Sequence, residues 1–370
     1  MFLETVQELP GTVVAVLPSE GPLAARLRAR NIRYNVRNYP VLRRIELRGL
    51  RNSVRFLFRF ISSLRSLARV IRRDADAVYV STVTAPVWVL AARLAGVPVV
   101  CHVHESEPGM SKARSLILLW PLRLARLIIA NSESTRAWIA AGTNARTASR
   151  IRVVHNGIPV LAGRLQEDAG SRESSRLIVV GRLSRGKGQD VAIRAVALLR
   201  KQGYDVSLSL VGQCFPGYES VVEDLHRLAR QLDLSTHVSF DGFQDPRPYY
   251  ESCDVVLVPS RVESFGLVAV EALFHRRPVV ATRVGGLSEI IRDGETGLLV
   301  EPEAVAGLAK AIATLLDDPV YAQRLARQGW AEAVDRFSSH SFARRLRSAL
   351  SSLGSLPDQS PGLAASDGHH

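Results

Sequence analysis

Two glutamates separated by seven residues, Glu263 and Glu271, form the pattern in this chain that most clearly points to chemistry. Glu263 lies in a loop that follows the apolar run Val255–Val258, whereas Glu271 stands inside a short apolar segment that we predict to be helical. A carboxylate among apolar side chains is costly unless it has a partner. We therefore expect Glu271 to accept hydrogen bonds from ligand hydroxyls; the alternative is a place on the polar edge of an amphipathic helix.

The surroundings of this pair predict an anion site. Helices should begin directly after the Glu263 loop and after the Gly-Gly turn at 285–286, both at the carboxyl ends of predicted parallel strands. Unpaired N–H groups at such helix starts attract phosphate groups. We expect Ser264 to cap the first helix. The N–H groups of Phe265, Gly266 and Leu267 would then point at a phosphate.

A glycine-rich loop, Gly181–Gly188 (GRLSRGKG), follows the predicted strand Leu177–Val180. It nearly matches the P-loop of nucleotide-hydrolysing enzymes, but Gly188 stands where a Ser or Thr would bind magnesium, so a P-loop is not favoured. The loop carries two cations, Arg182 and Lys187, and one interpretation is that both are solvated loop charges.

His102, His104 and Glu105 follow one another at the end of the predicted strand Val99–His102. Alternation along an extended chain places the two histidines on the same side. These residue types also bind metals, but nothing nearby in the sequence supplies further ligands, so we predict no metal site. We expect His104, at the strand end, to face a binding site, and His102 to be buried and hydrogen-bonded.

The E-x7-E pair, its loop, the Gly-Gly turn and the trailing Asp293-Gly294…Thr296-Gly297 together resemble the donor site of retaining GT-B glycosyltransferases, specifically glycosyltransferase family 4. The resemblance implies a nucleotide diphosphate sugar as donor substrate, with no metal and no other cofactor. The first Glu would face the sugar and the second the ribose, while Arg182 and Lys187 would hold the diphosphate. The predicted catalytic residues are His104, Arg182, Lys187 and Glu263, and the predicted donor-binding residues are Gly181, Arg182, Lys187, Glu263, Ser264, Phe265, Gly266, Leu267 and Glu271.

Two further short motifs follow the same family pattern. Ser132, after Asn131, is expected to cap a helix that borders the cleft. His155-Asn156-Gly157 resembles the family's hinge turn, in which Gly157 would permit a sharp turn and Asn156 would tolerate unusual backbone angles. We expect both motifs to be structural.

The length and composition of the chain exclude several classes of protein. A chain of 370 residues has room for two domains, and a hydrophobic content of 46% excludes a disordered chain. No uncharged apolar run reaches the roughly 18 residues that span a bilayer, and no secretory signal opens the chain, so we expect a cytoplasmic protein. Three widely spaced cysteines argue against a disulfide framework.

The net charge of +13 is concentrated near the N-terminus, where fifteen arginines and a single acid, Glu46, lie between Arg26 and Arg73. No nucleic-acid-binding motif accompanies them, so we expect no nucleic acid partner. An anionic membrane surface, at the inner face of the plasma membrane, is the partner that this charge favours. The predicted helix Val54–Arg73 also carries an apolar stripe that should pack on a sheet: Phe56, Phe60, Leu64, Leu67 and Ile71.

Short apolar strands alternate with helices in two series, which predicts an α/β fold with two doubly wound parallel sheets. The resemblance implies a GT-B architecture of two Rossmann-like domains facing across a cleft. We predict an acceptor-side domain (1–160), a linker (161–175), a nucleotide-sugar-binding domain (176–338), a helix crossing back to the first domain (339–353) and a disordered tail (354–370). Met1–Leu9 is predicted to be helical, so the first domain is expected to lack the opening strand and Gly-rich loop of the family.

The predicted function is therefore retaining transfer of a sugar to a glycan, a lipid-linked acceptor or a cell-envelope intermediate, as in polysaccharide biosynthesis. Two alternatives remain. One is a degenerate, N-terminally truncated transferase that acts as a binding or regulatory protein. The other is a nucleotide-sugar epimerase or a sugar phosphorylase on the same scaffold.

Overall fold

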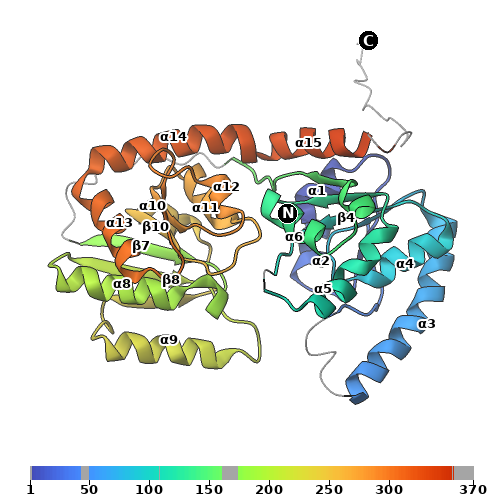
Figure 1. Cartoon of the computed structure of the whole chain (residues 1–370), viewed down its shortest axis with the longest axis horizontal. Coiled ribbons are helices and arrows are strands. Elements are labelled where there is room, and N and C mark those ends of the chain that lie inside the picture. The colour runs from blue at the N-terminus through green and yellow to red at the C-terminus, as the bar shows by residue number, and fades with distance from the viewer. Residues whose placement is uncertain (1, 43–49, 108, 161–173, 352, 354–370) are drawn as a thin grey trace, which may run out of the picture.

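The computed structural model describes residues 2–42, 50–107, 109–160, 174–351 and 353. Two α/β domains lie side by side and are joined along one edge by two consecutive helices, α14 (Pro319–Phe337) and α15 (Ser339–Ser351) (Figure 1). The predicted tail and the predicted linker up to residue 173 lie outside the described residues. The division into domains at particular residues stays a prediction.

The second domain is built on a six-stranded parallel sheet with the strand order β12-β11-β10-β7-β8-β9. Alternate residues of its central strand β7 point to opposite faces: Leu177 and Val179 belong to one hydrophobic core and Ile178 to the other. A strand buried on both faces needs helices on both sides, which is the doubly wound arrangement that the sequence predicts. The strands are β7 (Ser175–Val180), β8 (Val206–Val211), β9 (Val238–Gly242), β10 (Val255–Val258), β11 (Val279–Thr282) and β12 (Leu298–Val300).

Helices cover both faces of this sheet. The core on one face includes residues of α8, α9 and α13, and the core on the other face includes residues of α11 and α12, while α14 contributes residues to both cores. The short strand β12 and the short helix α10 were not predicted from the sequence. The helices are α8 (Gln189–Lys201), α9 (Glu219–Gln231), α10 (Arg247–Ser252), α11 (Leu267–Phe274), α12 (Leu287–Ile290) and α13 (Val305–Asp317), with a 3-10 turn η3 (Arg185–Lys187) before α8.

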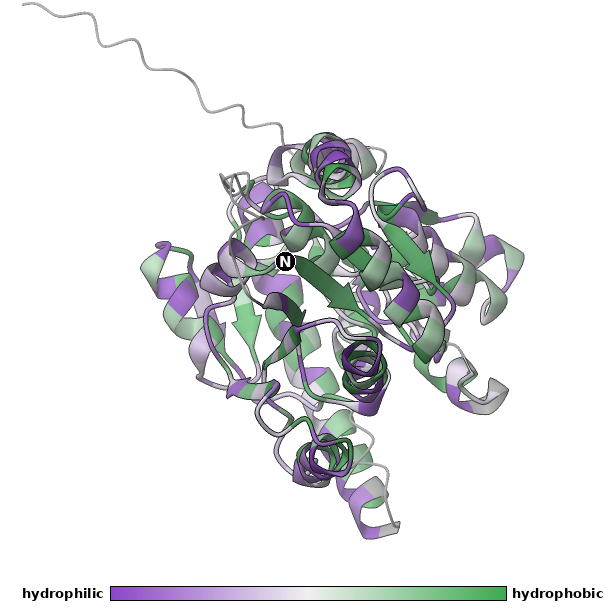
Figure 2. Ribbon diagram, turned by 90° about the vertical axis from the view of Figure 1, so that its left-hand side faces the viewer, coloured by the Kyte–Doolittle hydropathy of each residue, from purple (hydrophilic) through white to green (hydrophobic). Residues whose placement is uncertain are grey.

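The first domain contains a four-stranded parallel sheet, β3-β4-β5-β6, and a separate parallel pair, β1-β2. The described chain opens with a helix, α1, as predicted. In Figure 2, seen from the side of the second domain, the strands that can be made out are mostly green and therefore apolar, whereas the helices carry much of the purple. The strands are β1 (Ala15–Leu17), β2 (Tyr34–Val36), β3 (Val78–Val80), β4 (Val99–Val103), β5 (Leu127–Ala130) and β6 (Ile151–Val153); the helices are α1 (Phe2–Glu8), α2 (Pro22–Ala29), α3 (Leu50–Asp74), α4 (Pro86–Ala95), α5 (Lys112–Leu119), the 3-10 helix η2 (Trp120–Leu124), α6 (Glu133–Ala141) and α7 (Ala145–Ala148).

The apolar stripe of α3 packs as predicted from Phe60 onward, whereas Phe56 belongs to none of the hydrophobic cores of the described residues. Leu67 and Ile71 are buried, and Phe60 and Leu64 pack against the same core, which includes residues of α4 and of the first sheet. None of the helices within the described ranges is long and apolar enough to cross a membrane.

Helices α14 and α15 tie the two domains together. Asp318 caps α14 by accepting a hydrogen bond from the Tyr321 N–H at 2.9 Å. After Ser338, which is extended, α15 continues onto the first domain, where its Phe342 and Leu346 share a small core with residues of β4 and β5. One helix of the chain's C-terminal region thus completes the core of the N-terminal domain.

Candidate functional site

Two loops at the carboxyl ends of β7 and β10 bring Lys187 and Glu263 together. Lys187 Nζ lies 2.5 Å from Glu263 Oε2, and only 27% and 11% of the two side chains are exposed. The Ser260 hydroxyl donates a further hydrogen bond to Glu263 Oε2 at 3.3 Å. These two predicted site residues, which are 76 positions apart, therefore form one ion pair at the edge of the sheet where ligands of such folds bind.

Glycines allow the loops of this site to approach one another closely. Gly188 has a φ of +68°, and a Cβ at this position would lie 1.9 Å from the Pro259 carbonyl oxygen. A Cβ on Gly285 would lie 1.8 Å from the Glu263 carbonyl oxygen, which also accepts the Gly286 N–H at 3.2 Å. The Gly-Gly turn is thus packed directly on the loop that carries Glu263.

Arg182 does not join the Lys187–Glu263 pair. Its guanidinium lies over the ring of Phe215, 4.0 Å from the centroid, in a cation–π contact with the loop that follows β8. Phe215 was not singled out from the sequence, and 55% of it is exposed. The two cations that we expected to act together thus have different partners here.

Glu271 lies on α11 and is largely buried, as its apolar neighbours predicted. Its Oε2 accepts a hydrogen bond from the Tyr250 hydroxyl at 2.9 Å. Burial raises the pKa of the Glu271 carboxyl above its usual value, although the Tyr250 hydrogen bond acts in the opposite direction. Tyr250, on α10, is itself almost completely buried and was missed in the sequence, where nothing links it to Glu271.

The start of α11 differs from the prediction in one respect. Ser264 does not cap this helix: the capping position is Gly266, with a φ of 114°, and no side chain accepts a hydrogen bond there. A Cβ on Gly266 would come within 2.6 Å of the Leu287 side chain, which favours glycine over a capping serine. The Phe265 side chain is buried in the core beside Phe337. The N–H groups at this helix start thus lack a side-chain cap, as a ligand-binding helix terminus requires.

On the first domain, the two histidines lie side by side at the end of β4. Their ring centroids are 4.0 Å apart, so the predicted placement on the same side is confirmed. His102 is buried and its Nδ1 lies 2.6 Å from the Tyr79 hydroxyl, as expected for a structural histidine. His104 Nε2 lies 3.2 Å from the Ser81 hydroxyl, and burial lowers the pKa of His104 to about 4. His104 is therefore neutral near pH 7 and can exchange hydrogen bonds without carrying charge.

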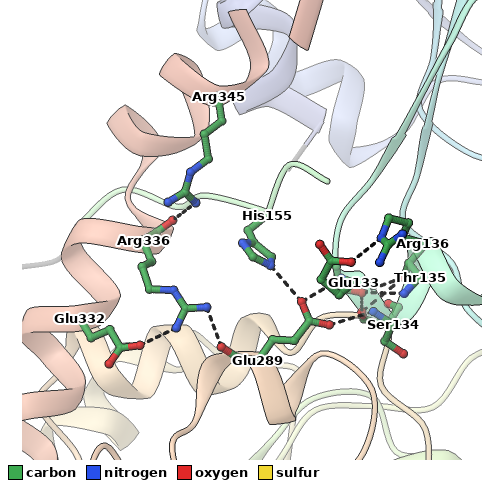
Figure 3. Close-up of polar contacts among 11 residues, drawn as sticks. Glu133, Ser134, Thr135, Arg136, His155, Glu289, Glu332, Arg336 and Arg345 are labelled. Atoms are coloured by element: carbon green, nitrogen blue, oxygen red, sulfur yellow. Dashed lines mark hydrogen bonds and ion pairs between the residues drawn. The ribbon is translucent and has the colours of Figure 1, made fainter. Parts of the chain in front are cut away.

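The two domains touch through Glu289 of α12 (Figure 3). Its carboxylate accepts the backbone N–H groups of Glu133 and Ser134, at the start of α6, at 2.8 and 2.9 Å. His155 Nε2 lies 2.9 Å from the same carboxylate. Glu289 thus occupies the N-terminus of a helix in the other domain, where a negative charge is favoured. This contact could not be predicted from the sequence, because the partners of Glu289 lie more than 130 positions away along the chain.

A second contact joins the domains at the same place. The Ser132 hydroxyl, which caps α6 by accepting the Thr135 N–H at 3.0 Å, donates to the Ser264 carbonyl oxygen at 2.6 Å. The predicted cap is therefore confirmed, and it also contacts the loop that carries Glu263. On the other side of α12, Arg336 donates to the Glu289 carbonyl oxygen at 2.8 Å (Figure 3).

The hinge turn needs its glycine for a reason other than the one predicted. Neither Asn156 nor Gly157 has a positive φ, so a left-handed backbone conformation is not the reason for the glycine. A Cβ on Gly157 would instead lie 2.4 Å from the Phe342 Cβ and 2.6 Å from the Ser338 carbonyl oxygen. The turn is thus pressed against the junction of α14 and α15.

No group of three or more His, Cys, Asp or Glu side chains in the described part of the chain is arranged to hold a metal ion. Cys101, Cys214 and Cys253 form no disulfide bond within the described part of the chain.

Comparison with known proteins gives a consistent result over both domains. Residues 165–331 match the family model "Glycosyl transferases group 1", and residues 7–160 match "Glycosyltransferase Family 4". The chain is 32% identical over 292 residues to a D-inositol 3-phosphate glycosyltransferase 1 of Catenulispora acidiphila, which covers 68% of both chains. It is 31% identical over 245 residues to a glycogen synthase of Mycobacterium tuberculosis, which covers 64% of this chain and 58% of the relative.

A second D-inositol 3-phosphate glycosyltransferase, from an Arthrobacter species, is 34% identical over 252 residues, and the match spans only 59% of that relative's length. Among solved structures, Anabaena Alr3699/HepE in complex with UDP and glucose superimposes with a TM-score of 0.79, covers 95% of both chains and is 26% identical. The sucrose-phosphate synthase of Thermosynechococcus elongatus has a TM-score of 0.72 at 22% identity and shows the fold alone. The predicted GT-B fold is confirmed by these likenesses.

Proposed function

The chain belongs to the glycosyl transferases of group 1, and on that premise we propose that it transfers a sugar from a nucleotide diphosphate sugar to an acceptor hydroxyl, with retention of the anomeric configuration. The observation that carries the proposal is the Lys187–Glu263 ion pair, held beside the uncapped start of α11 and the Gly-Gly turn. A cation, a carboxylate and free N–H groups are the partners that a diphosphate and a sugar need.

In the proposed donor complex, the diphosphate lies at the start of α11 and draws Lys187 away from Glu263. Glu263 is then free to accept a hydrogen bond from a sugar hydroxyl. The Glu271 oxygen that does not bind Tyr250 accepts a ribose hydroxyl. His104 approaches the sugar from the first domain as a neutral hydrogen-bonding group.

The proposed reaction takes place on one face of the sugar. The bond from the anomeric carbon to the diphosphate oxygen breaks, the acceptor oxygen forms a new bond to that carbon, and the acceptor proton passes to the departing phosphate oxygen. Lys187 and Arg182 stabilise the charge that accumulates on the diphosphate, which is greater in the transition state than in the bound donor. In this scheme no metal ion is needed.

The nucleotide that we propose is uridine diphosphate, because UDP is bound in the 26% identical HepE structure. We propose a glycan, a lipid-linked molecule or a cell-envelope intermediate as the acceptor, since these are hydroxyl acceptors that a cytoplasmic transferase of polysaccharide biosynthesis would meet.

The test begins with nucleotide binding. Thermal-shift measurements with UDP, GDP and ADP should show stabilisation by one nucleotide, expected to be UDP, in the native chain and not in the Lys187→Ala or Glu271→Ala variants. Lys201→Ala and Glu301→Ala, at exposed positions, are the matched controls. A native protein that melts cooperatively but responds to none of the three nucleotides would refute the donor site and favour a binding or regulatory role without a nucleotide.

Catalysis is tested with the donor that binds. Release of the nucleoside diphosphate should require an acceptor, and the anomeric proton coupling of the product should match that of the donor. Conversion of the sugar without an acceptor would instead indicate an epimerase. A requirement for inorganic phosphate would indicate a phosphorylase, and inversion at the anomeric carbon would overturn the proposed front-face reaction.

A further inference from the structure

The N-terminal half of α3 carries a second apolar face that lies outside every hydrophobic core of the described structure. The residues of this face are three or four positions apart, so they share one side of the helix. Figure 1 shows this end of α3 projecting away from the rest of the first domain. The residues and their exposed fractions are Val54 (58%), Leu57 (56%), Phe58 (75%) and Ile61 (53%).

Exposed arginines surround and extend this apolar face. Arg65 and Arg72 follow Val54 by 11 and 18 positions, which is close to a whole number of helical turns, so they continue the same side of the helix. The only acidic residue of α3 is Asp74, at its far end. The exposed arginines of the helix are Arg51, Arg55, Arg65, Arg69, Arg72 and Arg73.

We propose that this surface of α3 docks the first domain onto an anionic lipid bilayer. Val54, Phe58 and their neighbours would enter the boundary between head groups and acyl chains, and the arginines would contact the anionic head groups. The sequence suggested such a partner only through its charge; the apolar face adds a group that water disfavours and that a bilayer accepts. The proposal concerns where the protein works, not which reaction it catalyses, so it stands independently of the proposed function.

Charge and chemistry together favour a bilayer over the other occupants of this face. Nucleic acid would satisfy the arginines but would leave Leu57 and Ile61 without an apolar partner. A second copy of the chain would cover the apolar face but would bring arginines of like charge together. An anionic bilayer satisfies both kinds of side chain.

The experiment is sedimentation of the full chain with vesicles, in the absence of any sugar donor. At low salt the protein should co-sediment with vesicles of phosphatidylcholine mixed with phosphatidylglycerol. It should co-sediment only weakly with vesicles of phosphatidylcholine alone. The double change Phe58→Ser with Ile61→Ser is expected to weaken binding by about tenfold or more, because two exposed apolar side chains are lost. The double change Arg51→Gln with Arg55→Gln is expected to weaken it by about fivefold per arginine.

Matched substitutions on the second domain test whether the loss of any exposed apolar side chain or of any positive charge weakens vesicle binding. Phe243→Ser removes a side chain that is 74% exposed, and Arg324→Gln with Arg327→Gln removes two charges from an exposed face of α14; neither should alter binding. The proposal is overturned if the native chain does not sediment with anionic vesicles, or if the Phe58 and Ile61 variant binds them as the native chain does. It is also overturned if sedimentation velocity shows a dimer that this variant loses, because a second copy would then occupy the face.

Discussion

At the scale of single residues, the ion pair between Lys187 and Glu263 is the feature on which the proposed chemistry depends. A cation fixed at the departing diphosphate stabilises the transition state more than the bound donor. Lys187→Ala is therefore expected to lower kcat by about 100- to 1000-fold, with a smaller effect on KM. Steady-state kinetics with saturating acceptor measure both constants.

Lys187→Arg, which keeps the charge, should recover part of the lost rate, whereas the remote Lys201→Ala should change neither constant. A rise in KM with an unchanged kcat would mean that Lys187 binds donor and transition state equally, and the role given to it in the transition state would be wrong.

The Glu271–Tyr250 pair predicts a pH dependence of nucleotide binding. Ribose hydroxyls donate to the ionised carboxylate, and burial holds the pKa of Glu271 above its usual value. Affinity for the nucleotide should therefore fall as the pH drops through that raised pKa. Tyr250→Phe removes a hydrogen bond that favours the ionised form, so it should move the fall in affinity to higher pH. Isothermal titration calorimetry across acidic to neutral pH measures this shift.

The control for this prediction is Glu271→Gln, in which no carboxyl titrates and the pH dependence should be flat. Tyr250→Phe is also expected to cost about 1–3 kcal/mol of stability, because it leaves a buried carboxylate without its donor. If the native protein and Glu271→Gln showed the same pH profile, Glu271 would not be the group that binds the ribose.

The spacing of residues along the chain predicted only part of this site. The E-x7-E spacing and the glycine-rich loop predict the two loops that meet, since both follow strands of one parallel sheet. The partners Tyr250 and Phe215 could not be predicted, because they come from α10 and from the loop after β8, whose positions depend on the packing of the whole domain.

Among the secondary-structure elements, the close approach of the loop after β7 to the loop after β10 depends on one glycine. Gly188, the residue directly before α8, has a left-handed φ, and a Cβ there would overlap the Pro259 carbonyl group. Gly188→Ala should therefore displace the Glu263 loop, lower stability by about 1–3 kcal/mol and weaken nucleotide binding. Chemical denaturation and calorimetry measure the two effects.

Gly186→Ala is the matched control in the same loop. Its Cβ would meet nothing closer than the Ser184 hydroxyl at 4.0 Å, and its φ is not left-handed. This variant should keep the stability and affinity of the native chain. Equal losses in both variants would show that the loop needs flexibility rather than the close approach to Pro259.

Many strands could be predicted in type and order, because they are apolar runs bounded by polar loops, as at Val255–Val258, whereas the three-residue strand β12 was missed. Helix ends were harder to predict. Ser264 has the residue type of a cap, but the packing of Leu287 against the loop selects Gly266 for that position instead. Such a choice depends on a neighbour 21 positions further along the chain and cannot be read from local preference.

Across the molecule, a covalent connection and a group of polar contacts link the two domains. In the covalent connection, α14 continues through Ser338 into α15, whose Phe342 and Leu346 lie in the core of the first domain. The polar contacts include that of Glu289 with α6 and His155 (Figure 3). Because α12 follows directly after the Gly-Gly turn of the site, this contact links the position of the first domain to the donor side of the site.

The Glu289 contact is expected to weaken in acid and to be lost when its charge is removed. Burial tends to raise the pKa of Glu289, but hydrogen bonds from His155 and from the α6 N–H groups outweigh it, so the pKa lies below its usual value. A lowered pKa in the folded state means that the stabilisation is present above the usual glutamate pKa and is lost as the pH falls through the lowered value. Glu289→Gln should therefore reproduce, at neutral pH, the effect of acid on the native protein.

Hydrogen exchange at the N–H groups of Glu133 and Ser134 measures this contact directly, because both groups are protected only by Glu289 among the hydrogen bonds found for them. Their exchange should quicken in Glu289→Gln, while Glu295→Gln, an exposed position nearby, should leave it unchanged. Loss of the contact frees the domains to move about the α14–α15 junction, so small-angle scattering should show a larger radius of gyration. Unchanged exchange and an unchanged radius in Glu289→Gln would mean that the Glu289 contact does not fix how the two domains are placed.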